Sequence, residues 1–179
     1  MTRLAIALVH HPVLDAQGGV VTSTLTNIDV HDLSRSAKTY GCTDFFVVHP
    51  IEAQRDLCAR IVEHWTTGSS SKRIPDRKDA LALVRIVPTI ADAAAALGNP
   101  RIWVTAARTL GSPLSWPDAR RSLEDDPRPV LLLFGTSWGL APEITDRADA
   151  VIAPIDGGSG WNHLSVRAAC AIALDRLRG

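Results

Sequence analysis

The chain has 179 residues, a length typical of one domain with a buried core, and we expect residues 1–179 to form a single domain. Hydrophobic residues make up 46% and charged residues 21%, which is ordinary for a soluble globular protein, and no apolar run reaches the roughly 18 residues that a membrane span needs. The formal net charge of +0 lacks the basic excess of many nucleic-acid-binding domains, so any contact with a nucleic acid must use a local patch.

The cysteines and histidines indicate neither a disulfide framework nor a metal site. Cys42, Cys58 and Cys170 are odd in number and form no CxxC pair, which favours buried reduced thiols in a cytoplasmic protein. His10 and His11 are adjacent, but no partner set at metal-ligand spacing accompanies them, so we expect no metal. The apolar stretch before them is too short for a signal peptide and is better explained as a buried strand.

Short apolar runs alternate with longer amphipathic segments. Runs rich in Leu and β-branched residues are typical of strands covered on both faces, as in a parallel sheet. The expected strands are residues 4–9, 44–48, 83–87, 101–105, 130–134 and 150–153. Apolar spacings of three and four predict helices at residues 29–39, 51–65, 89–97 and 164–177. This alternation predicts an α/β domain with a mostly parallel sheet of about six strands flanked by helices.

Two longer polar segments are expected to be connections. Residues 66–79 are rich in Ser and basic residues, which predicts a mobile loop. The only dense basic run lies there and has two explanations, a solvated loop or a contact to RNA phosphates. Its members are Lys72, Arg73, Arg77 and Lys78. Residues 108–126 form the second connection, punctuated by Gly and Pro.

Two glycine-rich segments follow the fifth and sixth expected strands, at residues 133–143 and 152–169. Ligands of α/β folds bind at the carboxyl ends of parallel strands, where glycines let the backbone approach. No GxxxxGK[ST] phosphate loop is present. These segments therefore favour a nucleotide-like ligand held by main-chain groups, and the alternative is that the glycines serve only turns.

These segments resemble the second and third motifs of the SPOUT methyltransferases, in particular the group related to the SpoU ribose methyltransferases. The last helix begins Ser165-Val-Arg-Ala-Ala169, as the third motif does. Asp29, Arg35 and Gly41 match the spacing of the first motif, and Val104-Thr-Ala-Ala-Arg108 is similar to a turn that some members place against the cofactor. The resemblance thus covers most of the chain in the family's order.

The resemblance implies a C-terminal trefoil knot, S-adenosyl-L-methionine as cofactor with S-adenosyl-L-homocysteine as product, an RNA substrate such as tRNA or rRNA, and a homodimer with shared active sites. Carried onto this chain, the cofactor-binding residues are Thr105, Ala106, Phe134, Gly135, Thr136, Gly139, Leu140, Ile155, Gly160, Asn162, Leu164 and Ser165.

Three positions depart from the ribose-methylating pattern. Ser137 replaces a glutamate of the second motif, His163 replaces an asparagine of the third, and Asp29 replaces an asparagine of the first. Asn162 lies one place before His163. Both ribose 2′-O and base nitrogen therefore stay open as the methylated atom.

The candidate catalytic residues are Arg35, Asp29, His31 and His163. A guanidinium binds phosphate bidentately and lowers the pKa of a nearby hydroxyl, although a surface arginine is the alternative for Arg35. Asp29 shares a helical face with Asp32 and Arg35, and capping is its alternative.

Histidines accept protons near neutral pH, and the alternatives are a structural histidine for His31 and a helix cap for His163. Ser165 is equally a candidate cap. Trp138 and Trp161 flank the two loops as hydrophobic lids or as stacking surfaces for a base.

Three functions follow, and methylation of RNA is the first. The second is methylation of a protein or small molecule by the same domain, which the neutral charge allows. The third is a non-catalytic module that binds the cofactor, because fold alone does not establish activity.

Overall fold

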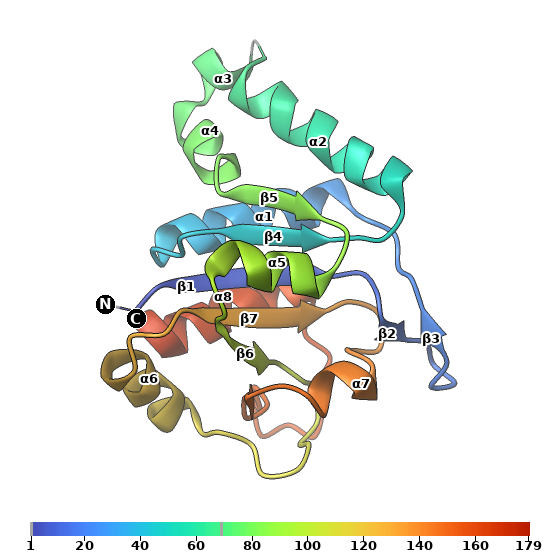
Figure 1. Ribbon diagram of the computed structural model, residues 1–179, viewed down its shortest axis with the longest axis vertical. Helices are drawn as coiled ribbons and strands as arrows, with labels where there is room; N and C mark the ends of the chain where they lie inside the picture. Colours follow the sequence, from blue (N-terminus) through green and yellow to red (C-terminus); the bar gives the residue numbers. More distant parts are fainter. Residues whose placement is uncertain (1, 69) are drawn as a thin grey trace.

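The computed structural model describes residues 2–68 and 70–179, and its centre is a parallel sheet (Figure 1). Within these residues the sheet has six strands in the order β5-β4-β1-β7-β6-β8, and every neighbouring pair is parallel. The strands are β1 (Leu4–Val9), β4 (Phe45–Val48), β5 (Val84–Val87), β6 (Arg101–Val104), β7 (Val130–Gly135) and β8 (Ala150–Val151). The predicted α/β architecture is confirmed.

Each face of the sheet builds its own core, as the period-two geometry of a strand requires. In β1, Leu4, Ile6 and Leu8 join one cluster, whereas the intervening smaller residues join the other. The first cluster packs under α1 (Asn27–Thr39), α6 (Trp116–Asp125) and α8 (Val166–Arg178). The second packs under α5 (Ile90–Leu97) and α7 (Pro142–Thr145). Figure 1 shows α5 in front of the sheet, with α1 and α8 behind it.

Side-chain caps determine where α1, α5 and α8 begin. Thr26 caps α1: its hydroxyl accepts the N–H of Asp29 and donates to the Asp29 carboxylate at 2.6 Å. Thr89 and Asp92 form the same pair at the start of α5. Ser165 caps α8 by accepting the N–H of Ala168 at 3.2 Å. The capping alternative is therefore confirmed for Ser165, whereas the cap of α1 is Thr26 and Asp29 supports that cap from the first turn.

The prediction of a mobile loop at residues 66–79 was wrong. After α2 (Glu52–Thr66), the chain forms α3 (Ser70–Arg73) and α4 (Pro75–Leu81). Proline is tolerated at the first helical position, and Ala80 and Leu81 anchor α4 by burying their side chains. The guanidinium of Arg77 stacks over the ring of Trp65 at 4.5 Å. The polar composition reflects the exposed faces of two short helices.

The connection at residues 108–126 was also predicted too simply, because its second half is α6. Ser115 caps this helix, and Pro117 occupies its first turn, where the missing N–H has no cost.

A hairpin that was not predicted follows β1. β2 (Val13–Leu14) and β3 (Val20–Val21) pair antiparallel, and the strands are too short for a period-two pattern. β2 also pairs with the chain after β7: the Leu14 N–H donates to Gly139 O at 2.9 Å, and the Trp138 N–H donates to Leu14 O at 3.0 Å. The hairpin thus supports the second-motif segment.

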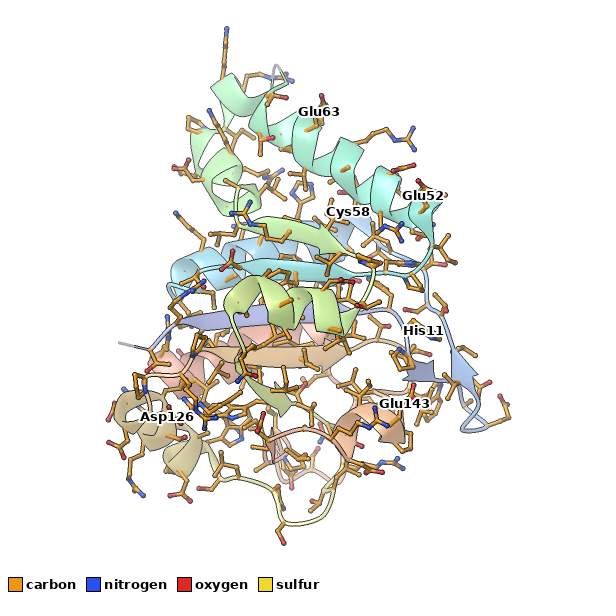
Figure 2. All side chains as sticks on the ribbon, viewed as in Figure 1. His11, Glu52, Cys58, Glu63, Asp126 and Glu143 are labelled. Atoms are coloured by element: carbon orange, nitrogen blue, oxygen red, sulfur yellow. The ribbon has the colours of Figure 1, made fainter. Side chains whose placement is uncertain are left out.

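The cysteines are buried and free, as expected. Burial raises the thiol pKa values of Cys42 and Cys58 to about 12 and that of Cys170 further. Figure 2 labels Cys58 on α2, where Glu52 and Glu63 stay exposed. Across residues 2–68 and 70–179, no helix is long and apolar enough to cross a membrane, and no cluster of His, Cys, Asp or Glu suits a metal ion.

Candidate active site

Three loops meet at the carboxyl edge of the sheet because β7, β6 and β8 are neighbours. They follow β6 (residues 105–115), β7 (residues 136–141) and β8 (residues 152–165). The Asn162 side-chain amide donates to Ala107 O at 2.5 Å, which joins the first loop to the third. The Thr105 hydroxyl donates to Leu133 O at 3.0 Å, which ties the first loop to β7. The structure therefore brings the predicted cofactor segments together.

The second-motif turn covers residues 135–140 and is shaped by its glycines. The Gly139 N–H donates to Thr136 O at 3.0 Å, and the turn uses positive φ angles at Ser137 (+55°) and Gly139 (+101°). A Cβ on Gly135 would lie 2.7 Å from Leu140 N, so only glycine fits there. The Phe134 and Leu140 side chains are buried in the core and leave only their main chains for a ligand.

The third-motif loop borders a cavity of about 320 Å³, a size at the lower end of small-molecule sites. Its lining residues are Ile155, Asp156, Gly157, Trp161, Asn162, His163, Leu164, Ile172 and Arg176. The rings of Trp161 and His163 lie 4.6 Å apart, and both residues are exposed. The cavity thus contains several predicted cofactor residues and one predicted catalytic residue.

The apolar walls and open main chain of this cavity suit the adenosine part of a cofactor, and Asp156 and Arg176 bring one negative and one positive charge to it. Ile155 and Leu164 offer apolar walls for a base, and a Cβ on Gly157 would meet no atom within 4 Å, so the main chain is open to a ligand there. The Asp156 carboxylate accepts the N–H of Gly158 at 2.7 Å and supplies a negative charge beside the cavity.

A second cluster joins α1 to α8, and its central residue, Arg167, was not among the predicted site residues. The Arg167 guanidinium bonds the Asp29 carboxylate at 2.9 Å and lies 3.5 Å from that of Asp32. Arg167 and Arg35 both line a groove between α1 and α8 of about 420 Å³, whose residues are Asp32, Arg35, Ser36, Thr39, Tyr40, Arg167, Ala168 and Ala171. An arginine in the first turn of α8, directly before the apolar run of residues 168–174, was the signal that could have revealed it.

The geometry changes two of the catalytic assignments. Both oxygens of Asp29 are engaged, one by Arg167 and one by Thr26, so this buried carboxylate anchors α1. His31 packs edge-on against Trp65 at 5.3 Å, away from the Asp29–Arg167 pair. Burial, aided by Arg77, lowers its pKa, which keeps the ring neutral. Arg35 and His163 remain exposed in separate hollows.

An all-parallel sheet with glycine turns after two neighbouring strands, followed by a capped C-terminal helix, is the architecture of the SPOUT methyltransferases. The structure of TrmJ from Z. mobilis superposes with a TM-score of 0.65 at 17% identity, covering 99% of this chain and 69% of that one. This similarity establishes the fold.

The chain belongs to the family described as SAM-dependent RNA methyltransferase, which matches residues 3–179. A tRNA (guanine-N(1)-)-methyltransferase of Nitratidesulfovibrio vulgaris is 42% identical over 181 residues, covering 99% of this chain and 42% of the relative. An uncharacterized protein of Aquifex aeolicus is 36% identical over 177 residues, covering 96% of this chain and 86% of the relative. The chain thus spans less than half of the first relative's length.

Proposed function

We propose that this chain is an enzyme that transfers a methyl group from S-adenosyl-L-methionine to RNA. The observation that carries the proposal is the meeting of three loops at the carboxyl edge, two of them glycine-rich, in a member of an RNA methyltransferase family. When bound, the cofactor supplies an activated methyl group on sulfur. The protein must hold the cofactor, align the nucleophile and aid its deprotonation.

The predicted cofactor residues keep that role, with one refinement. Phe134 and Leu140 would contribute through their main chains because their side chains are in the core. The cavity side chains of Ile155, Asn162 and Leu164 would contact the cofactor directly. The same segment would thread as a trefoil knot through the loop of residues 105–115: the Leu114 N–H bonds Val151 O at 2.7 Å, and the Ala153 N–H bonds Leu114 O at 2.9 Å.

Arg35 would bind an RNA phosphate and lower the pKa of the attacking group, either a ribose 2′-hydroxyl or a base nitrogen. His163 would accept the proton, because its exposed ring borders the cofactor cavity. Asp29 and Arg167 would position α1.

We also propose a homodimer. Arg35 lines a groove that shares no residue with the cofactor cavity, so the Arg35 that acts at that cavity would come from a second copy. Light scattering at micromolar concentration should give twice the mass of one chain; a monomer would count against a shared site.

RNA contact would use exposed aromatic and basic side chains. Trp138 and Trp161 are 64% and 72% exposed beside the two glycine loops, which suits stacking on unpaired bases. Lys72 and Lys78 are exposed on α3 and α4, whereas Arg77 is engaged with Trp65. We propose tRNA as the first substrate to test, with rRNA as the second. Buried free thiols support a cytoplasmic location.

The test has two stages. Calorimetry should show binding of S-adenosyl-L-methionine to the unmutated protein and none to Gly135→Arg, and no binding to the unmutated protein would refute the proposal. Incubation with radiolabelled cofactor and RNA from a strain lacking the gene should then label RNA. Label in protein or small molecules alone would indicate a different substrate, and no label would indicate a binding module. Mass spectrometry of the labelled nucleosides identifies the methylated atom.

A further inference from the structure

A partly buried polar cluster lies between β1, β4 and the second-motif turn, and only its Thr136 has a role among those above. Its members, the Ser23 cluster, are His10, Ser23, His49 and Thr136. His10 and His49 are 0% and 1% exposed, and their ring centroids are 5.0 Å apart. Polar groups are buried at a cost unless they are hydrogen-bonded, so the connections within this cluster matter.

Ser23 is the centre of the cluster. Its backbone N–H donates to His10 O at 2.9 Å, and its carbonyl lies 3.0 Å from His49 Nε2. Its hydroxyl lies 2.9 Å from His10 Nδ1 and 2.5 Å from the Thr136 hydroxyl. One residue therefore joins the ends of β1 and β4 to the turn proposed to hold the cofactor.

The hydrogen bonds fix where the protons are. Thr136 donates its hydroxyl proton to Val9 O at 3.2 Å, so it accepts the proton of Ser23. Ser23 then accepts from His10 Nδ1–H. His10 Nε2 is therefore unprotonated, and no group of the described residues donates a hydrogen bond to it.

His49 has the opposite tautomer. The Ile51 N–H donates to its Nδ1 at 3.2 Å, so the proton of the His49 ring is on Nε2 and is donated to Ser23 O. Both rings are neutral, and burial lowers both pKa values. The result is a directed chain of donors that runs from His10 through Ser23 to Thr136 on the cofactor turn and ends at Val9 O.

The Ser23 cluster is also connected to α1, the helix that carries the first motif. Ser23 precedes the cap residue Thr26, and between them the Leu25 N–H donates to the Gln54 side chain at 2.9 Å. The segment that leads into α1 is thus held at both Ser23 and Leu25. Because α1 carries Arg35 and the turn carries Gly135, the position of Ser23 sets the placement of one relative to the other.

We propose that Ser23 is a positioning residue that holds Thr136, and with it the second-motif turn, in the conformation that binds S-adenosyl-L-methionine. The inference rests on the proposed function of that turn. Thr136 lies between Gly135, where no Cβ fits, and Ser137, whose φ is +55°. A turn with these restrictions binds well only when it is preorganised, and the bond from Ser23 provides that restraint.

The test compares three variants by calorimetric titration with S-adenosyl-L-methionine. Ser23→Ala should weaken binding roughly tenfold, since it removes one hydroxyl bond to the turn and leaves His10 Nδ1–H unpaired. Ser23→Thr keeps the hydroxyl and should bind within about twofold of the unmutated protein. Thr22→Ala is the matched control: its hydroxyl bonds His11 Nδ1 at 3.0 Å on the exposed side, near the His11 labelled in Figure 2, and its loss should leave binding unchanged.

A double-mutant cycle guards against a general loss of stability. Thr136→Val removes the other end of the bond, and with Ser23→Ala it should weaken binding about as much as Thr136→Val alone. If the two losses of affinity for S-adenosyl-L-methionine multiply in the double variant, the proposal is overturned. It is also overturned if Ser23→Ala binds the cofactor as tightly as the unmutated protein.

Nitrogen NMR of the cofactor-free protein gives a readout independent of binding. His10 should show a protonated Nδ1 and an unprotonated Nε2, and Ser23→Ala should remove that fixed tautomer. Failure of the unmutated protein to bind cofactor would refute the proposed function, whereas the opposite His10 tautomer would refute the Ser23 cluster alone.

Discussion

Acid should destabilise this protein through His10, and the size of the effect follows from its burial. Burial, with a smaller contribution from His49, lowers the pKa of His10 from 6.5 to about 4. Between these pH values the unfolded chain binds a proton that the folded chain does not, so stability falls as pH falls. Each pH unit in that window costs about 1.4 kcal/mol, which gives roughly 2 kcal/mol between about pH 7 and about pH 4.5.

Urea unfolding of the unmutated protein and His10→Asn at both pH values measures this contribution. The asparagine keeps a donor toward Ser23 but has no proton to gain, so its stability should fall by roughly 2 kcal/mol less on acidification. Two other histidines with lowered pKa values, the half-buried His31 and the buried His49, titrate in both proteins, so their contributions largely cancel in the comparison. If both proteins lose the same stability, His10 is not held neutral and the reasoning is refuted.

Three further changes test the site. Gly135→Ala should destabilise the fold by about 1–3 kcal/mol because its Cβ would lie 2.7 Å from a backbone nitrogen, and Gly157→Ala, whose Cβ meets no atom, should leave the melting temperature unchanged. Arg167→Ala should lower the free energy of unfolding in urea by about 2 kcal/mol, because it leaves the buried Asp29 carboxylate without its ion-pair partner. Arg121→Ala, which breaks an exposed ion pair, is the control and should cost under about 0.5 kcal/mol. Equal losses in the two variants would show that Arg167 does not anchor α1. Arg35→Ala should lower kcat roughly hundredfold with cofactor affinity unchanged, and an unaltered kcat would exclude it from catalysis.

The sheet could be predicted because its signal is local. Runs such as Leu4–Val9 are apolar throughout, since both faces of the sheet are covered, and few other structures bury such a run on both sides. The helices at residues 66–79 were missed because their anchors are few: Ala80 and Leu81 are buried, whereas Lys72–Asp76, Lys78 and Asp79 are exposed. The amino-acid composition of this segment shows that its exposed face is polar, but it does not show which residues pack against the rest of the protein.

The candidate site was predictable in its loops but not in its pairings. Gly135 and Ser165 are local requirements, one for close backbone approach and one for a cap, and both can be seen in a motif. Arg167 pairs with Asp29 across 138 positions, and Ser23 reaches Thr136 across 113. Spacing along a chain carries no information about such contacts, so their partners emerge only from the fold.

The rates at which the three buried thiols are modified report how often the helices around them open. Cys58 lies in α2, Cys170 in α8 and Cys42 just after α1, and all three are at most 5% exposed. A thiol with a raised pKa behind a packed helix reacts with a disulfide reagent only during moments when that helix detaches. The three modification rates, resolved by mass spectrometry, would therefore rank the opening of α1, α2 and α8, and a bound cofactor should slow the rate at Cys170 most if it clamps the start of α8.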